Sequence, residues 1–401
     1  MTEMAARIDI TLETVTPLFL GGAEPRGKPE LRSPSFRGAL RYWLRAALGG
    51  VLGDDEKAVR CAEASVFGST EEEWGGASAV IIQVSHPTLT PQEFRKQPAQ
   101  TIIKYGRQLK QPTGRDYLYW PMAQFRNLPA RYFIPPNTSF TLTLRVRPGV
   151  PDWESKLYQA MGALWLLVQL GGVGSRSRRT AGSLVVSEPE QFSNLSFALK
   201  GSTPRDIAAE LGEGLKRIRT TLERVYKAEP PKFQGPHAAF DVLHPQVCKI
   251  WVLGLWASWE KAVESIGAAF RDFRTYREPD HTEVERWLNG ESISTVERAV
   301  FGLPLPFRYQ NGPSGTVQGR TQPAGEEITR RASPLWLKVS KTKGEQFAGI
   351  ATLFLSAFLP EKAELYAQGG QGPALPPPKD YSLILKFVGE KFPKAVEVKY
   401  D

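Results

Sequence analysis

The segment from Gly171 to Leu184, GGVGSRSRRTAGSL, is the part of this 401-residue sequence whose residue types most clearly indicate chemistry. It contains four glycines, no acidic residue, and three arginines within four positions. Glycines let a backbone approach a ligand closely, and guanidinium groups bind phosphate oxygens in pairs. The segment therefore predicts a flexible loop that contacts phosphodiester groups. The predicted contact residues are Gly171, Gly172, Gly174, Ser175, Arg176, Arg178 and Arg179.

Two well-known phosphate loops do not fit this segment. A Walker A loop needs a lysine before Ser or Thr and opens a helix, whereas this segment has no lysine and precedes a strand. The dinucleotide pattern needs a third glycine where Ser177 stands, and it also opens a helix. A nucleotide-binding enzyme is thus disfavoured. A solvated loop with chance arginines is the remaining alternative, and the missing acids argue against it.

A second basic cluster lies between Leu31 and Leu48, LRSPSFRGALRYWLRAAL. Its apolar residues fall on one helical face, while arginines recur every four residues on another. Ser33 or Ser35 is expected to cap the helix, whose positive N-terminus favours an anion. No acidic residue lies on the arginine stripe, which argues against an ordinary solvated face. The predicted phosphate contacts here are Ser35, Arg37, Arg41 and Arg45.

The stretch from Arg95 to Arg147 combines ten Lys or Arg residues with a single acid, Asp116, and with interleaved aromatic residues. Basic side chains hold the backbone of a single-stranded nucleic acid, and rings stack on its bases. We expect about half of these rings to be in the core. Lys104 and Arg107 are the predicted RNA contacts in this insertion.

Groupings that would perform catalysis are sparse. His237, His244 and Cys248 lie near one another, but a fourth zinc ligand is missing, and no Ser-His-Asp or Cys-His arrangement stands out. Asp116 is the only isolated acid in a basic aromatic setting. The sequence therefore predicts no metal, no cofactor and no enzymatic activity.

Hydrophobic periodicity predicts the elements that must position these residues. The first half reads strand 8–15, helix 35–48, strand 78–84, strand 139–146, helix 153–170 and strand 183–187. This β-α-β-β-α-β order is ferredoxin-like, as in RNA-recognition modules with one free sheet face. We predict an N-terminal domain over residues 1–190 with a basic, aromatic insertion at 87–137.

The second half, residues 191–401, is less regular and predicts a second ferredoxin-like domain with helical insertions. Its predicted helices are 205–225 and two short ones near Val284 and Val296. Residues 249–273 fit a strand or a helix. The predicted strands are 335–340, 350–358 and a final one over YSLILKFV, residues 381–388. Val-Phe-Gly ends a helix in both halves, at 66–68 and at 300–302, which favours two copies of one unit.

Five segments resemble proteins of the RAMP superfamily, and in particular the Cmr subunit one family of the type III-B CRISPR effector complex. The glycine-rich loop resembles the one that defines the superfamily. The segments are ETVTPLFLGGAEPRGKPELRSPSFRGALRYWLRA (13–46), the loop at 171–184, AVFGLPLPF (299–307), RRASPLWLKV (330–339) and FLSAFLP (354–360). The resemblance spans residues 13–360.

The resemblance implies an α+β fold of two tandem ferredoxin-like domains. It also implies a non-catalytic subunit that holds the 3′-side of the guide RNA (crRNA) at the head of a ribonucleoprotein, beside neighbouring RAMP subunits, and supports target RNA capture in antiviral defence. Its implied guide contacts are Ser35, Arg37, Arg41 and residues 171–179, with Arg330 and Arg331 as weaker ones. Thr180-Ala181 stands where such loops often continue with glycine. The alternative is a metal-independent ribonuclease that processes guide RNA, with His86 as general base.

The net charge of +9 is consistent with an anionic partner, although charge alone does not define a fold. Two cysteines far apart give no disulfide framework, which indicates a reducing compartment. The N-terminus lacks an apolar signal core, and the longest apolar runs are too short to span a bilayer. We therefore expect a cytoplasmic protein with no membrane partner.

Overall fold

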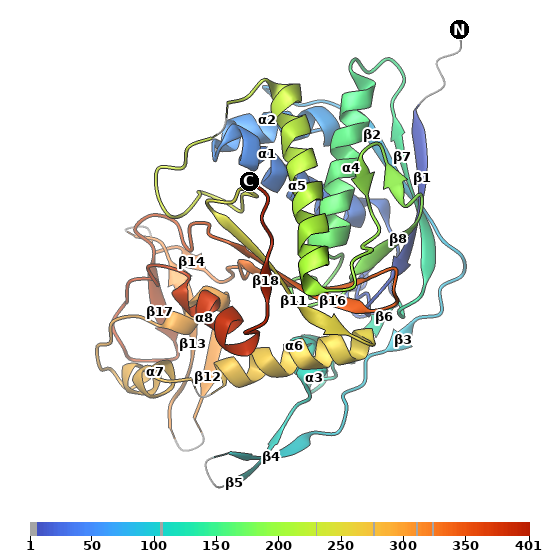
Figure 1. The fold of residues 1–401 in the computed structure, drawn as a ribbon. Coiled ribbons are helices and arrows are strands. Elements are labelled where there is room, and N and C mark those ends of the chain that lie inside the picture. The colour runs from blue at the N-terminus through green and yellow to red at the C-terminus, as the bar shows by residue number, and fades with distance from the viewer. Residues whose placement is uncertain (1–5, 105–106, 230, 276, 310–311, 323–324) are drawn as a thin grey trace.

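The structure, a computed structural model, describes residues 6–104, 107–229, 231–275, 277–309, 312–322 and 325–401, and within 102–109 it describes no side chain. It is an α+β fold built on antiparallel sheets (Figure 1). Two four-stranded sheets form the frame, one in each half of the sequence. A further sheet and three short two-stranded sheets belong to the insertions and connections.

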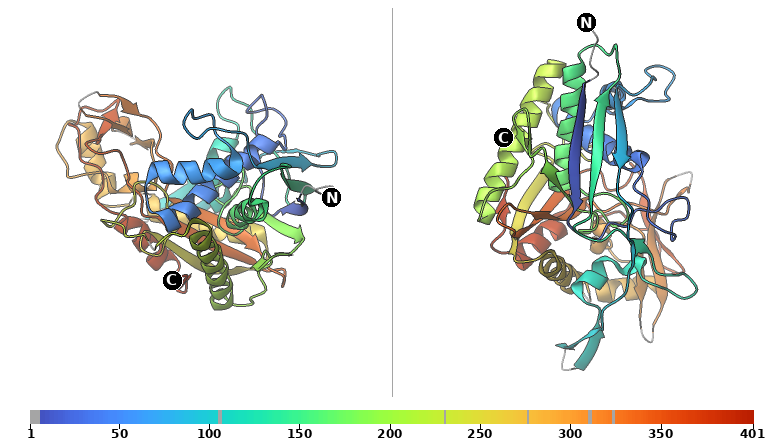
Figure 2. Two further views of the ribbon diagram at one scale, coloured as in Figure 1. Left: turned by 90° about the horizontal axis from the view of Figure 1, so that it is seen from above. Right: turned by 90° about the vertical axis from the view of Figure 1, so that its right-hand side faces the viewer.

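The first sheet has the order β2-β7-β1-β8, and every neighbouring pair is antiparallel. Its strands are β1 (Arg7–Thr14), β2 (Val80–Ser85), β7 (Ser139–Val146) and β8 (Leu184–Glu188). Helix α1 (Ser33–Leu52) follows β1, α2 (Glu56–Phe67) follows α1, and α4 (Trp153–Leu170) connects β7 to β8. These helices lie on one side of the sheet (Figure 2). The β-α-β-β-α-β order predicted for this half is present.

The second sheet has the order β15-β16-β11-β18, again antiparallel throughout. Its strands are β11 (Cys248–Trp256), β15 (Leu335–Lys341), β16 (Phe347–Phe354) and β18 (Val396–Glu397). Helix α6 (Trp259–Arg274) follows β11, and α8 (Ser382–Lys391) precedes β18. The order of elements and the order of strands are therefore the same as in the first sheet. The ambiguous stretch 249–273 contains both a strand and a helix.

The second half contains two groups of inserted elements. Between α6 and β15 lie α7 (Asp280–Leu288), the 3-10 helix η2 (Glu297–Phe301), β12 (Leu305–Arg308), β13 (Ser314–Arg320) and β14 (Glu327–Ile328), while β17 (Glu364–Gln368) follows β16. Strand β17 pairs with β13. Helix α5 (Pro204–Tyr226) joins the halves, begins at a Thr203–Asp206 capping box, and packs on α1, α4 and β11.

The insertion of the first half packs on the second half. It contains β3 (Gln92–Glu93), β4 (Gln100–Lys104), β5 (Arg107–Gln111), α3 (Gly114–Leu118), the 3-10 helix η1 (Trp120–Met122) and β6 (Tyr132–Phe133). Helix α3 lies directly on α6, where Glu264 accepts hydrogen bonds from the backbone N–H groups of Gly114 (2.8 Å) and Arg115 (3.0 Å). A Cβ on Gly267 would stand 2.1 Å from the Gly114 carbonyl, so the two backbones touch.

The predicted final strand, YSLILKFV, is wrong, because these residues form α8. Leu383, Ile384, Phe387 and Val388 are buried together in the second core. These four residues are spaced by one, three and one positions, which places them on one face of a helix. The other apolar residues of the segment hide this spacing in the sequence. The last strand is instead the short β18, and it completes the second sheet.

The two Val-Phe-Gly segments form equivalent turns. Gly68 ends α2 at φ +74°, and Gly302 ends η2 at φ +113°. A Cβ on Gly68 would stand 2.7 Å from the Ser78 nitrogen, and one on Gly302 would stand 3.1 Å from the Ser333 nitrogen. Ser78 lies two residues before β2, and Ser333 lies two residues before β15. Each turn therefore packs against the residues that precede β2 or β15, although β12 to β14 lie between Gly302 and β15 in the sequence.

Both buried cores contain residues from each side of position 190, and the domain boundary there stays a prediction. One core joins Trp43 and Trp165 to Ile250 and Phe354, and the other joins Phe19 to the second half. Because each core contains residues from both halves, the two sheets are packed together as one body. Within the described ranges, no helix has an apolar stretch long enough to cross a bilayer.

Candidate nucleic-acid interface

The glycine-rich segment lies between the two sheets rather than on a free surface. Residues 171–173 and 179–183 are buried, and only 174–178 are partly exposed. Ser175 N donates to the Phe19 carbonyl (2.8 Å), and Thr180 N donates to the Leu337 carbonyl on β15 (2.8 Å). The segment predicted as a flexible loop is therefore hydrogen-bonded to the backbone of both halves of the chain.

The three arginines of this segment bond to the protein itself. Arg176 Nε donates to the Leu118 carbonyl (2.6 Å), and the Arg178 guanidinium bonds to the Ser333 carbonyl. Arg179 donates to the carbonyls of Leu335 (2.8 Å) and Phe301 (3.3 Å) and stacks on Phe270. Burial lowers the pKa of Arg179 well below its usual value. Arg179 thus joins the glycine-rich segment to the second half of the chain, and RNA contact by these residues stays a prediction.

The glycines of the segment are explained by internal packing. A Cβ on Gly171 would stand 2.3 Å from Nε1 of Trp43, and a Cβ on Gly172 would stand 2.9 Å from the Ala181 carbonyl. Gly174 has φ +84°, and its Cβ would stand 2.5 Å from the Phe19 carbonyl. The close approach that glycine permits is therefore made to this protein's own chain.

The arginine stripe of α1 has an acidic partner that comes from α2. Arg41 Nε lies 2.5 Å from a carboxylate oxygen of Glu63, and an Nη atom of Arg45 lies 3.2 Å from the other. The Glu63 side chain is 2% exposed, so it is held between the two guanidiniums. The inference from missing acids was wrong, because the acid lies on the next helix. Arg37 is partly buried, and no partner for its buried Nε lies among the described residues.

The predicted serine cap of α1 is also absent. The N-cap residue is Arg32, with no side-chain cap hydrogen bond, and Pro34 occupies the first turn. Ser35 is partly exposed on the first turn. The side chains of Lys104 and Arg107 lie outside the described residues.

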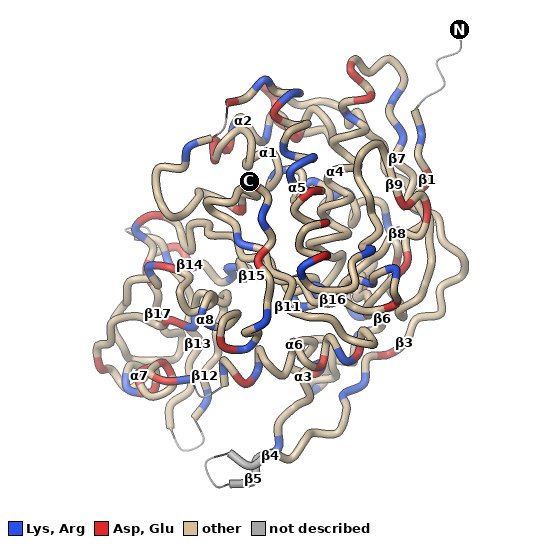
Figure 3. Tube along the Cα trace, in the orientation of Figure 1, with Lys and Arg blue, Asp and Glu red and all other residues tan. Residues whose placement is uncertain are grey.

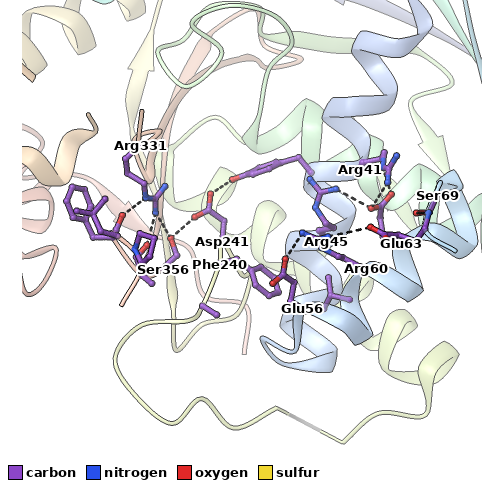
Figure 4. Close-up of a pocket in the computed structure, with 18 of the residues that line it drawn as sticks. Arg41, Arg45, Glu56, Arg60, Glu63, Ser69, Phe240, Asp241, Arg331 and Ser356 are labelled. Carbon is purple, nitrogen blue, oxygen red and sulfur yellow. Dashed lines mark hydrogen bonds and ion pairs between the residues drawn. The ribbon is translucent and has the colours of Figure 1, made fainter. Parts of the chain in front are cut away.

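Several separate segments meet at one cleft of about 710 Å³ (Figure 4). Helices α1 and α2 form one wall, and residues 239–241 and 356–360 form the other, where Arg331 also lies. The cleft thus brings Arg41 and Arg45 of the stripe together with the predicted Arg331 and with the FLSAFLP segment, whereas Ser35 and Arg37 do not line it. Arg330 is exposed and does not line it.

Asp241 connects the two walls at the base of the cleft. It accepts hydrogen bonds from the Tyr42 hydroxyl (2.7 Å) and the Ser356 hydroxyl (2.7 Å), and Arg178 lies 3.5 Å away. Arg331 donates to the Ser356 hydroxyl (3.1 Å) and to the Phe358 carbonyl (2.7 Å). Burial, with Asp241 beside it, raises the pKa of the Tyr42 phenol well above its usual value. No pattern in the sequence singles out Asp241, which is an isolated acid there.

The charges that line the cleft balance. Its guanidiniums are Arg41, Arg45, Arg60 and Arg331, and its carboxylates are Glu56, Glu63, Glu71 and Asp241. Across the molecule, basic and acidic residues are likewise interspersed (Figure 3). The cleft therefore offers positioned N–H donors rather than a strong positive field. Among the described lining residues there is no histidine to serve as a general base.

The other candidate groups stand apart from the cleft. His86 is exposed, with Nδ1 2.8 Å from the Pro87 carbonyl. Asp116 is buried and bonded to Arg115 (2.8 Å), so it is a structural ion pair. Within the described ranges, no group of three or more His, Cys, Asp or Glu side chains is arranged to hold a metal ion.

Comparisons with known proteins connect this arrangement to one family. The model of the RAMP superfamily matches residues 11–185. The chain is 25% identical over 355 residues to CRISPR system Cmr subunit Cmr1-1 of Pyrococcus furiosus, covering 88% of this chain and 89% of that protein. It is 30% identical over 183 residues to Cmr subunit Cmr1-2 of the same organism, covering 44% of this chain and 92% of that protein.

Two solved structures share the fold over nearly the whole chain. The crystal structure of Cmr1 from Pyrococcus furiosus in its apo form matches with a TM-score of 0.59 and 21% identity, covering 98% of this chain and 99% of that one. A chain in the cryo-EM structure of the type III-B Cmr-beta complex bound to cognate target RNA matches with a TM-score of 0.54 and 12% identity, with the same coverage.

Proposed function

Because the chain belongs to the Cmr1 family of the RAMP superfamily, we propose that it is an RNA-binding subunit of a type III-B CRISPR effector complex. In this role it holds the 3′-side of the guide RNA at the head of the complex, beside neighbouring RAMP subunits, and supports capture of target RNA in the cytoplasm. It is a non-catalytic part of antiviral defence. The cleft at α1 and α2 is the site that binds the guide RNA.

The convergence of separate segments on one cleft carries this proposal. Helix α1, the region of Arg331 and residues 356–360 are far apart in sequence and form opposite walls of the same hollow. A guanidinium has five N–H donors, so Arg41 and Arg45 can pair with Glu63 and still donate to phosphate oxygens. Such contacts hold the sugar-phosphate backbone without reading the base sequence.

We further propose that both sheets are ferredoxin-like units in tandem. The same order of elements, the same order of strands and the equivalent turns at Gly68 and Gly302 support this arrangement. The first unit carries the arginine stripe, and the second carries Arg331. An RNA in the cleft would therefore touch both units.

Replacing Arg45 and Arg60 by Gln tests the cleft. Both are at least one-third exposed, and Arg41 would still pair with Glu63, so the fold should tolerate the change. We expect weaker binding of a guide-like single-stranded RNA, by about ten-fold, and a salt slope reduced by about two. Fluorescence anisotropy at several salt concentrations measures both quantities.

Lys386→Gln is the matched control, since Lys386 lies on α8 outside the cleft and pairs with Glu390 at the surface. It should bind RNA as the wild type does. Equal affinity of the double variant and the wild type would remove the cleft from the RNA path. The RNA recovered on a denaturing gel should be intact, and a cut RNA would favour the ribonuclease alternative.

A further inference from the structure

Exposed aromatic residues gather on the insertion of the first half, away from the cleft. Among the described residues, seven large hydrophobic side chains are strongly exposed, and four of them lie within residues 120–132. Trp120 is 51% exposed and Phe125 is 41% exposed, with Leu128 and Tyr132 beside them in sequence. Exposed apolar side chains that gather on one segment mark a binding site more often than a scattered residue does.

These rings are held by a rigid base. Tyr119, next to Trp120, is buried and packs edge-on against Phe19 with ring centroids 5.6 Å apart. Phe125 and Leu128 exchange backbone hydrogen bonds of 3.1 and 3.0 Å, which close a tight turn. Trp120 and Phe125 meet edge to face at 5.9 Å. The exposed rings are therefore already positioned before a ligand binds, which reduces the entropy lost on binding.

Cations surround the rings, and the nearby acids are already engaged. The Lys96 ammonium lies 4.0 Å from the centre of the Trp120 ring, and the Arg126 guanidinium lies 5.3 Å from that of Phe125. Residues 87–137 contain eight Lys or Arg and two acids. Of these acids, Glu93 lies 3.6 Å from Arg95, and Asp116 is buried against Arg115. The surface thus combines flat π systems with positive charge.

A shallow hollow of about 510 Å³ is lined in part by residues of the same insertion. It is lined by residues 23–27, Pro129 and Arg131, and so holds two guanidiniums, Arg26 and Arg131, with one carboxylate, Glu24. Arg131 donates to the hydroxyl of Ser175 at 2.8 Å. The glycine-rich segment therefore reaches this second surface through Ser175.

We propose that Trp120 and Phe125, with Lys96 and Arg126, form an aromatic platform that stacks unpaired bases of single-stranded RNA, while Arg26 and Arg131 receive its phosphates. Rings for bases and cations for the backbone are the combination that sequence-independent binding of a single strand requires. Lysine is depleted in the cores of protein–protein interfaces, so its place over Trp120 favours RNA over a protein partner. The platform shares no residue with the lining of the cleft.

This inference rests on the proposed function and adds a second RNA contact to it. The test compares the full-length wild type with Trp120→Ala/Phe125→Ala, and with Trp120→Phe/Phe125→Tyr, which keeps both rings. Trp153→Ala is the matched control, because Trp153 is 45% exposed on α4 and lies outside the insertion. The probes are a labelled oligoadenylate of about 12 nucleotides and an abasic oligomer with the same number of phosphates.

The alanine variant should bind oligoadenylate roughly ten-fold or more weakly, and it should bind the abasic oligomer as the wild type does. The ring-keeping variant and Trp153→Ala should match the wild type on both probes. In addition, oligoadenylate should quench the tryptophan fluorescence of the wild type more than that of Trp120→Phe.

Two outcomes would overturn the platform. The first is unchanged oligoadenylate affinity in the alanine variant, and the second is an equal loss for the abasic oligomer. If the first outcome came with lost association to neighbouring subunits, the surface would be a protein contact. If the wild type bound neither probe, the proposed function itself would fail with it.

Discussion

At the scale of single residues, burial divides the arginines into two groups. Arg179 is 7% exposed and bonds to carbonyls of the second half, whereas Arg45 is 38% exposed at the rim of the cleft. The sequence places both in stretches without acidic residues. A buried guanidinium surrounded by carbonyls has a structural role, because its donors are needed where water cannot reach them.

We expect Arg179→Ala to destabilise the protein by roughly 3 kcal/mol, because it leaves buried carbonyls unpaired and a cavity beside Phe270. Arg179→Lys should recover only part of this loss, since an ammonium does not reproduce the planar fork. Denaturant unfolding measures the change. A variant with wild-type stability and lost RNA binding would instead support direct phosphate contact by Arg179.

At the scale of elements, two turns with the same sequence direct the chain from helix to strand. Gly302 has φ +113° and stands against the backbone before β15, as Gly68 does before β2. Only glycine combines this backbone conformation with so close a contact. The turn is a requirement of the repeated unit rather than a feature of the RNA site.

Gly302→Ala should lower the free energy of unfolding by roughly 2 kcal/mol, since alanine is strained at this φ and its Cβ would stand 2.9 Å from the Arg331 carbonyl. Gly38→Ala is the control. Gly38 lies on the exposed side of α1 with no atom within 4 Å of its ideal Cβ, so this change should stabilise the helix slightly. Thermal unfolding would compare them, and equal melting temperatures would contradict the strain.

At the scale of the whole molecule, the two sheets are packed together around a buried lysine. Lys338 on β15 is 1% exposed, and its ammonium donates to the Leu184 carbonyl on β8 at 3.3 Å. Burial lowers the pKa of Lys338 to about 7. The packing of the two sheets therefore depends on the protonation state of Lys338, whose ammonium would lie in water without the other half.

The sign of the pH effect follows from the lowered pKa of Lys338. Between about pH 7 and the usual lysine pKa, the unfolded chain binds this proton and the folded protein releases it, so stability should rise with pH. Lys338→Met should remove this rise and stabilise the protein at neutral pH, on the order of 2 kcal/mol. Unfolding free energies of both proteins from pH 7 to 8.5 test this, and parallel pH profiles would contradict it.

Local patterns in the sequence determined much of the first half and of the connecting helix. Strand β7, helix α4 and, within one residue at each end, helix α5 are where periodicity places them, because the spacing of apolar residues depends only on near neighbours. The basic stripe of α1 is likewise readable. Helix α8 was misread as a strand because a short apolar run fits both periods.

Only the tertiary structure decided what these residues contact. Glu63 lies 22 residues from Arg41 and Asp241 lies 199 residues from Tyr42, yet each forms a direct contact in the cleft. The sequence shows no hydrogen-bond partners for the glycine-rich segment, because those partners, Leu337 and Ser333, belong to the other half. The type of a side chain determines which bonds it can form. Long-range packing determines which partner lies beside that side chain and whether water still reaches it.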